Sequence, residues 1–378
     1  KEARPTGIGL DGERLWRPEG PPCAGERTVR AAARARVLST CVEGGVVALV
    51  VEAADGRRLL ERLNPVFADL AFASGFPIRH PDIRGRPVDS YLFLPPDGAA
   101  PKGVLVHYYP GPADSGRWDD PLSLRTSLRP QLLALGGYAV LSVATAMEGE
   151  SRLDARFDDF AASLDLALDA ASRDRPDLPW DRLALYGHSF GGYAALAAAS
   201  RTDRFRAVIA ASAPTLMFSA WAEPMSTSRL WPEEWLTFNQ RIGAYEAGQA
   251  GLGGPPWTAP SAYAAASPLL AADKIAAPVL LITADRDYVP MTQSEAMFAA
   301  LHRQGRRARL IVYWGEGHGL SSPANIRDVY AQIFRWLDET LEPSAREARA
   351  PDADPALEGD YDQQVGVAAA PDEAFPGQ

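Results

Sequence analysis

The sequence Leu-Ala-Leu-Tyr-Gly-His-Ser-Phe-Gly-Gly-Tyr, residues 183–193, decides the fold of this chain. Its first four residues are apolar and predict a short buried strand, and the alanine-rich run 194–199 predicts a helix. Between them, residues 187–191 fit the pattern G-x-S-x-G with Ser189 at its centre. A strand, a tight turn and a helix are the setting in which this pattern forms a nucleophile elbow, a turn that holds a serine hydroxyl above the edge of a sheet.

Glycine is needed on both sides of such a serine, because backbone and substrate approach the turn closely. Gly187, Gly191 and Gly192 meet this requirement. The start of the following helix directs amide donors toward the place where negative charge would develop. The pattern alone proves little in a chain of 378 residues with 32 glycines, so the interpretation depends on finding a base and an acid further along the chain.

The rest of the chain alternates between predicted strands and predicted helices. The strands are expected at 88–94, 103–109, 138–143, 183–186, 207–211, 278–283 and 308–314, and the helices at 128–135, 153–172, 194–199, 294–304 and 326–341. This alternation predicts an α/β fold with a mostly parallel sheet covered by helices on both faces. Together with the elbow, it predicts an α/β-hydrolase catalytic domain over residues 76–341.

The two ends of the chain differ from this central part. Residues 1–75 are expected to form a short β-rich segment. Its strands are predicted at 37–42, 46–51 and 59–63. Residues 342–378 are reduced to mainly alanine, proline, aspartate and glutamate, which predicts a disordered acidic tail.

The composition excludes several kinds of partner. A net charge of −10 argues against nucleic acid and anionic membrane surfaces, and no apolar run reaches the roughly 18–20 residues that a membrane span needs. The two cysteines, Cys23 and Cys41, lack a C-x-x-C pattern, and their pairing cannot be inferred from spacing. No metal-binding pattern such as H-E-x-x-H and no nucleotide-binding glycine loop occurs, so no metal or cofactor is expected. We expect a soluble protein of the cytoplasm or periplasm, and its oligomeric state stays open.

A serine of this kind needs a histidine as base, on a loop that follows a late strand. The chain has five histidines: His80, His107, His188, His302 and His318. His318 follows the last predicted strand, and the glycines on either side of it allow its ring to approach Ser189 closely. The sequence therefore favours His318.

The other histidines fit the role of base less well. His80 precedes the predicted sheet, and His107 lies within an apolar strand. His188 belongs to the elbow and should point away from the serine, and His302 lies in a helix with exposed charge.

The acid that orients the histidine should follow a strand between Ser189 and His318. The loop 285–290, Asp-Arg-Asp-Tyr-Val-Pro, supplies Asp285 and Asp287. Asp285 is closer to the end of the strand, whereas Asp287 stands just before a segment that leads into a helix. The aspartate that is not used would form a turn or cap a helix. Either choice gives the order serine, aspartate, histidine, which is typical of α/β hydrolases.

The remaining roles follow from this arrangement. His318 would take the proton from Ser189 and return it to the leaving group, and the aspartate would stabilise the charged imidazole. The backbone N–H of Phe190 would bind the oxyanion. A second donor should come from the loop after an earlier strand, where Tyr109 begins the sequence Tyr-Pro-Gly-Pro.

Aromatic residues gather in the segment 214–260, which interrupts the alternation of strands and helices. One interpretation is an insertion that lines a substrate pocket. The residues that would line it are Phe218, Trp221, Trp231 and Trp235. The alternative is a helical excursion that buries its own tryptophans.

Together these residues resemble the catalytic domain of the prolyl oligopeptidase family of serine peptidases. The matching pieces are Gly-His-Ser-Phe-Gly-Gly-Tyr at 187–193, the loops that carry Asp287 and His318, and Tyr-Pro-Gly-Pro from Tyr109. The resemblance covers about residues 76–341 and favours Asp287 as the acid. It implies a peptide substrate, and a tyrosine side chain at the position of Tyr109 that helps to form the oxyanion hole.

The chain departs from this family at two points. Family members usually have glycine three residues before the catalytic aspartate, where this chain has Ala284. They also carry a long N-terminal β-propeller that gates the active site, and residues 1–75 are too few to close one, since a propeller needs about four blades or more. We expect these residues to be a remnant of a propeller. Either the chain is a fragment, or its active site is unusually open.

A narrower resemblance is to the branch that contains lasso peptide isopeptidases, which cleave the bond between a peptide's N-terminal amine and an Asp or Glu side chain. It is carried by Cys-Val-Glu at 41–43, Leu-Asn-Pro at 63–65, Asp-Tyr-Val-Pro at 287–290, Tyr-Trp-Gly-Glu-Gly-His at 313–318 and Ser-Pro-Ala-Asn-Ile-Arg at 322–327. The same triad would serve, because the bond is still an amide. An ester hydrolase and a non-catalytic binding module remain as alternatives on this fold.

Overall fold

The computed structural model describes most of the chain. The described residues are 7–8, 14–16, 26–33, 36–43, 46–53, 55–73, 75–96, 98–113, 129–145, 153, 155–224 and 238–341. Trp231 and Trp235 of the expected pocket, Cys23 and the expected acidic tail lie outside the described residues.

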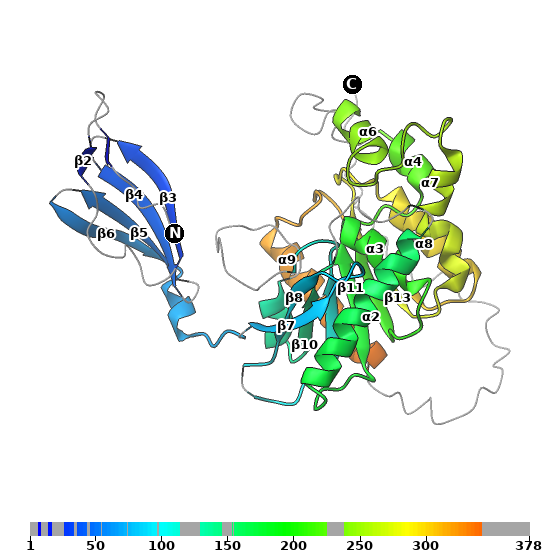
Figure 1. Cartoon of the computed structure of the whole chain (residues 1–378), viewed down its shortest axis with the longest axis horizontal. Coiled ribbons are helices and arrows are strands. Elements are labelled where there is room, and N and C mark those ends of the chain that lie inside the picture. Colours follow the sequence, from blue (N-terminus) through cyan, green and yellow to red (C-terminus); the bar gives the residue numbers. More distant parts are fainter. Residues whose placement is uncertain are drawn as a thin grey trace, which may run out of the picture. The chain divides into compact units, whose positions relative to one another are not determined.

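An eight-stranded sheet, in the order β14-β13-β12-β11-β9-β10-β8-β7, dominates the described part of the chain (Figure 1). Its strands are β7 (Gly75–Pro81), β8 (Pro87–Phe93), β9 (Val104–Tyr108), β10 (Ala139–Val143), β11 (Leu183–His188), β12 (Ala207–Ala211), β13 (Val279–Ala284) and β14 (Ala308–Tyr313). The strands from β14 to β10 run parallel, and β8 and β7 add antiparallel pairs. This is the mostly parallel sheet of the expected α/β-hydrolase fold.

The structure corrects the expectation for His80. This residue lies within β7, which pairs with β8 at the edge of the sheet. Its Nδ1 lies 2.9 Å from the carbonyl oxygen of Pro81, so Nδ1 carries the proton, and Nε2 accepts from the Ser90 hydroxyl at 2.7 Å. The prolines at 77 and 81 conceal this strand in the sequence, because proline is confined largely to edge strands.

The sheet is covered on both faces, which explains why its central strands are almost purely apolar. Successive residues of one strand point to opposite faces. Val104 and Val106 of β9 enter one hydrophobic core, and Leu105 between them enters the other.

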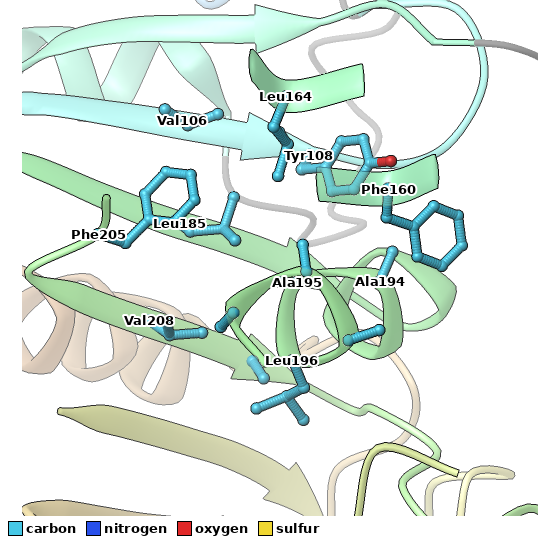
Figure 2. Packing of buried hydrophobic residues seen from close by; sticks show 14 of the residues in the cluster. Val106, Tyr108, Phe160, Leu164, Leu185, Ala194, Ala195, Leu196, Phe205 and Val208 are labelled. Carbon is cyan, nitrogen blue, oxygen red and sulfur yellow. The ribbon is translucent and has the colours of Figure 1, made fainter. Parts of the chain in front are cut away.

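Helices complete both cores. The first contains residues of α2 (Arg156–Asp174), α3 (Phe190–Ala199) and α8 (Thr292–Arg303), and the second contains residues of α1 (Pro130–Leu135) and α9 (Pro323–Leu341). Figure 2 shows part of the first core, where side chains of β9, β11 and β12 meet those of α2 and α3. The helices that the sequence predicts between the strands are all present, with small differences at their ends.

Between β12 and β13 the chain forms short helices. They are α4 (Met217–Ala222), α6 (Phe238–Glu246), α7 (Pro260–Ala265) and the 3-10 helix η2 (Pro268–Lys274). Trp221 is half-buried and donates its indole N–H to Glu246 at 3.0 Å, and its ring meets that of the exposed Trp257 edge to face. The excursion therefore does not bury all of its tryptophan surface.

The N-terminal part forms an antiparallel sheet in the order β3-β4-β5-β6. Its strands are β3 (Glu26–Ala33), β4 (Arg36–Glu43), β5 (Val46–Ala53) and β6 (Gly56–Leu63), preceded by the pair β1 (Gly7–Ile8) and β2 (Arg14–Trp16) and followed by the 3-10 helix η1 (Pro65–Asp69). The sequence predicts β4, β5 and β6 but not β3, whose charged residues conceal a strand pattern. Cys41 of β4 is disulfide-bonded. Among the described helices, none has the length and apolar character to cross a membrane.

Candidate active site

Ser189 lies at the tight turn between β11 and α3, where the sequence predicts the elbow. Its φ of 59° and ψ of −127° are strained for a residue with a side chain. Two backbone hydrogen bonds hold this conformation, because Ser189 N donates to Ala211 at 2.7 Å and Tyr193 N donates to the carbonyl oxygen of Ser189 at 3.0 Å. The neighbouring strand and helix thus impose the strain that presents the serine.

Side chains are excluded from three positions around this turn. A Cβ atom at Gly187 would collide with the backbone of Gly191, and one at Gly191 would collide with the carbonyl oxygen of Tyr108. A Cβ atom at Gly192 would lie 2.9 Å from the carbonyl oxygen of Ala211. Close backbone packing therefore requires all three glycines.

His318 and Asp287 meet in the loops that follow β14 and β13. His318 Nδ1 lies 2.8 Å from Asp287 Oδ1, which also accepts a hydrogen bond from the backbone N–H of Val289. The side chain of Asp287 is fully buried. Asp285 instead accepts a hydrogen bond from the backbone N–H of Gly315 and braces the turn. Of the two aspartates that the sequence offers, Asp287 is the one that contacts the histidine.

Tyr288 lies beside both the histidine and the serine, and the sequence alone does not indicate this. Its ring lies 4.0 Å from the ring of His318, measured between centroids, and it lines the same cavity as Ser189. Burial, with a contribution from the charge of Asp287, raises the pKa of Tyr288 to about 12. The hydroxyl therefore stays protonated at neutral pH.

His188 holds the loop that carries His318 through a hydrogen bond to its backbone. Its Nε2 donates to the backbone carbonyl oxygen of His318 at 2.7 Å, and the two rings lie 4.6 Å apart. Burial, together with the nearby His318, lowers the pKa of His188 to about 4. The sequence predicts only that this side chain points away from the serine, whereas in the structure His188 is neutral and holds the loop that carries His318.

Glu316 closes the same loop. Its buried carboxylate accepts hydrogen bonds from the backbone N–H groups of Ser321 and Ser322, from the Ser321 hydroxyl and from the Asn325 amide. Burial acts to raise the pKa of Glu316, but these hydrogen bonds outweigh it and hold the pKa below its ordinary value. A fully satisfied charge therefore fixes the loop that carries His318.

Tyr109 follows β9 and lies against the elbow at Gly191. Its side chain and backbone approach Gly191 so closely that a Cβ there would lie 3.0 Å from Tyr109 Cδ2. Its hydroxyl accepts a hydrogen bond from Gln249 Nε2 at 2.7 Å. Phe190, whose backbone N–H is the other expected donor, is the first residue of α3, where backbone N–H groups have no partner within the helix.

A cavity of about 90 Å³ lies beside Ser189, where roughly 10–15 Å³ is enough for one water. Residues of its lining that bear on chemistry are Ser189, Met217, Arg241, Tyr245, Gln249 and Tyr288. Phe218 and Trp221 are not among its lining residues, which corrects the expected pocket. Phe218 packs on Tyr263 instead, because successive residues of α4 face different neighbours and Met217 takes the position toward the cavity.

The strained serine between a strand and a helix, with an aspartate and a histidine from the loops after the next strands, defines the class of protein as an α/β hydrolase. The family model described as "Prolyl oligopeptidase family" matches residues 153–344, about half of the chain. The chain belongs to the prolyl oligopeptidase family, as the sequence analysis predicts.

Comparisons with individual proteins agree with this family. A probable chloroplastic glutamyl endopeptidase of Oryza sativa is 28% identical over 285 residues, which cover 69% of this chain and 27% of that protein. An acylaminoacyl peptidase of Pyrococcus horikoshii has a similar fold, with a TM-score of 0.61, 20% identity and coverage of 85% of this chain and 50% of that one. The isopeptidase AtxE2 has a TM-score of 0.59, 21% identity and coverage of 84% and 49%. The chain thus spans about a quarter to a half of these proteins.

Proposed function

We propose that the protein is a serine peptidase that cleaves amide bonds of peptides through an acyl-enzyme on Ser189. The contact between His318 Nδ1 and Asp287, 2.8 Å long and set beside a serine on a strained elbow, carries this proposal. A carboxylate bonded to Nδ1 keeps the proton on that nitrogen. Nε2 of His318 is then unprotonated and able to act as a base.

The reaction would begin with transfer of the Ser189 proton to Nε2 of His318 while the serine oxygen bonds to the scissile carbonyl carbon. The electron pair of the C=O bond moves onto its oxygen, where the Phe190 N–H and the Tyr109 hydroxyl would donate to it. His318 then protonates the leaving nitrogen as the C–N bond breaks, which leaves an ester on Ser189. Water, deprotonated by His318, hydrolyses that ester.

The narrower proposal is cleavage of an isopeptide bond, as in a lasso peptide. It is supported by the sequence motifs shared with that branch and by the structural similarity to the isopeptidase AtxE2. The relative from Oryza sativa, named a glutamyl endopeptidase, supports an ordinary peptide bond instead. The triad serves both, since each bond is an amide.

Mass spectrometry of digests tests these alternatives directly. Linear, branched and lasso peptides are incubated with the protein and with Ser189→Ala as the matched control. Cleavage of the peptide amides that depends on Ser189 supports a peptidase, and selective opening of the lasso supports the isopeptidase. Turnover of a p-nitrophenyl ester with no amide cleavage would assign an ester hydrolase, and failure to react with a fluorophosphonate probe would favour a binding module.

We also propose that the sheet β3–β6 corresponds to one blade of a β-propeller and that catalysis belongs to residues 76–341. Four antiparallel strands are the usual content of a blade, and this sheet has that number. Limited proteolysis between β6 and β7 tests the division. A fragment beginning near residue 76 that still reacts with a fluorophosphonate supports it, and loss of all labelling on cleavage contradicts it.

A further inference from the structure

Arg241 of α6 is buried, 4% exposed, and lines the cavity beside Ser189. Its Nη2 donates to the backbone carbonyl oxygens of Ala220 at 2.6 Å and Trp221 at 3.1 Å. The N–H groups on Nε and Nη1 are buried, and no group of the described residues accepts a hydrogen bond from them. A guanidinium carries five N–H donors, so the groups on these two nitrogens leave three of them unsatisfied.

Unsatisfied donors on a buried arginine lower the stability of the folded protein unless a bound group accepts their hydrogen bonds. A buried charge destabilises the folded state unless it is paired and hydrogen-bonded. Burial lowers the pKa of Arg241, but a guanidinium ordinarily titrates so far above neutrality that it stays charged. The charge of Glu223 acts on Arg241, and the Oε2 atom of Glu223 accepts a hydrogen bond from the Thr292 hydroxyl at 2.6 Å.

The rest of the cavity suits an anion. Its described lining contains no aspartate or glutamate. Tyr245 and Tyr288 both line it, and burial raises the pKa of each phenol, so both hydroxyls remain protonated and able to donate. Gln249 adds a side-chain amide. A cation and neutral donors thus surround a small space that opens beside the nucleophile.

We propose that this cavity binds a free carboxylate of the substrate, the side chain of a glutamate or aspartate on the residue that supplies the scissile carbonyl. The lining includes Ser189 and Phe190, and the attacked carbonyl must sit against both, so the side chain of that residue is the one directed toward Arg241. This assignment rests on the proposed peptidase function. It also favours an ordinary peptide bond, because an Asp or Glu side chain already joined in an isopeptide has no free carboxylate.

The test compares two fluorogenic peptides that differ only by Glu or Gln at the residue before the scissile bond. Both carry a C-terminal amide, so that only the side chain offers a carboxylate. The wild-type protein should prefer Glu by about 10- to 100-fold in kcat/KM, since hydrogen bonds to charged groups are among the stronger ones. In Arg241→Met this ratio should fall to about one or below.

Controls separate this proposal from the proposed function. The ratio is measured within each variant, so a difference in the amount of folded protein cancels, and Arg173→Met on the exposed surface of α2 serves as the matched arginine substitution that should leave the ratio unchanged. Ser189-dependent cleavage without a preference for Glu, or a preference that survives Arg241→Met, would overturn the carboxylate site alone. A third peptide carries Gln at this residue and a free C-terminal carboxylate. If the wild-type protein prefers this peptide and shows no preference for Glu over Gln in the amidated pair, the carboxylate site is overturned and Arg241 is assigned to the C-terminus of the substrate. No Ser189-dependent amide cleavage at all would overturn the peptidase itself.

Discussion

Glu316 and Arg241 are both buried charges, and their surroundings are opposite. Glu316 is 2% exposed and accepts four hydrogen bonds from the residues that follow His318. Arg241 is 4% exposed, and the donors on two of its nitrogens have no partner within the part of the chain that the structure describes. The two side chains are buried to a similar degree, but within the described residues the hydrogen bonds of Glu316 are made and some of those of Arg241 are not.

The difference separates scaffold from recognition. A charge whose hydrogen bonds are all made inside the protein stabilises one conformation, which suits the loop that must hold His318 in place. A charge whose donors remain unsatisfied destabilises the folded protein until a ligand accepts hydrogen bonds from them. Changes to the first region should alter catalysis through geometry, whereas changes to the second should alter substrate choice.

Ser189→Ala should reduce turnover most, because the His318 loop and the cavity with Arg241 both act on the reaction at the Ser189 hydroxyl. Loss of the nucleophile typically costs on the order of 10⁶ in turnover. Thermal unfolding should stay close to wild type, since the strained backbone is held by neighbouring backbone groups. Turnover near the wild-type level in this variant would exclude the elbow as the active site.

Asp287→Asn should have the next largest effect, as a direct disturbance of the His318 region. An amide in place of the carboxylate favours the wrong imidazole tautomer, which typically costs about 10⁴ in turnover. Asp285→Asn is the matched control, because Asp285 contacts the backbone of Gly315 and not the histidine. Steady-state kinetics on one peptide decide the matter, and a greater loss in Asp285→Asn would mean that the acid is misassigned.

Tyr109→Phe should give a smaller loss, at the boundary between the two regions. In the proposed mechanism its hydroxyl donates to the oxyanion, and in the structure it accepts a hydrogen bond from Gln249. One such donor is typically worth about 3 kcal/mol in the transition state, or roughly 10² to 10³ in kcat. The expected effect falls on kcat and leaves KM nearly unchanged. If only KM changes, Tyr109 lines the substrate path and takes no part in stabilising the oxyanion.

The smallest effects concern stability, and they contrast the two charges directly. Glu316→Gln should lower the free energy of unfolding by about 1–3 kcal/mol, because buried donors lose a charged acceptor. Arg241→Met should leave stability unchanged or raise it by about 1 kcal/mol, because it removes unsatisfied buried donors. Urea unfolding of both variants at neutral pH tests this. A greater destabilisation by Arg241→Met would contradict the contrast.

The dependence of stability on acid pH tests the contribution of Glu316 a second time. The pKa of Glu316 is lower in the folded protein than its ordinary value, so its contribution is present above the unfolded pKa and is lost as pH falls through the folded pKa. Wild-type stability should therefore fall more steeply than that of Glu316→Gln below about pH 4. Parallel acid curves for the two proteins would show that this carboxylate carries no such linkage.

Much of the fold could be predicted from local patterns. The strands from β9 to β13 are short, largely apolar runs, and a strand buried on both faces has few other compositions available. β7 and β3 could not be predicted from the sequence, because β7 contains prolines and β3 contains charged residues. The aromatic residues of the excursion suggested a pocket, but composition does not say which side of a short helix faces the cavity.

The sequence by itself determined the elbow, the family and the chain order of serine, aspartate and histidine, because each depends on residue types at fixed spacing along one chain. Only the tertiary structure decided that Asp287 and not Asp285 contacts the histidine, that His188 and Glu316 brace its loop, and that Met217 and Arg241 replace Phe218 and Trp221 at the cavity. These contacts join residues far apart in the chain, and burial, which alone turns an arginine into an unsatisfied charge, is a property of the packed molecule.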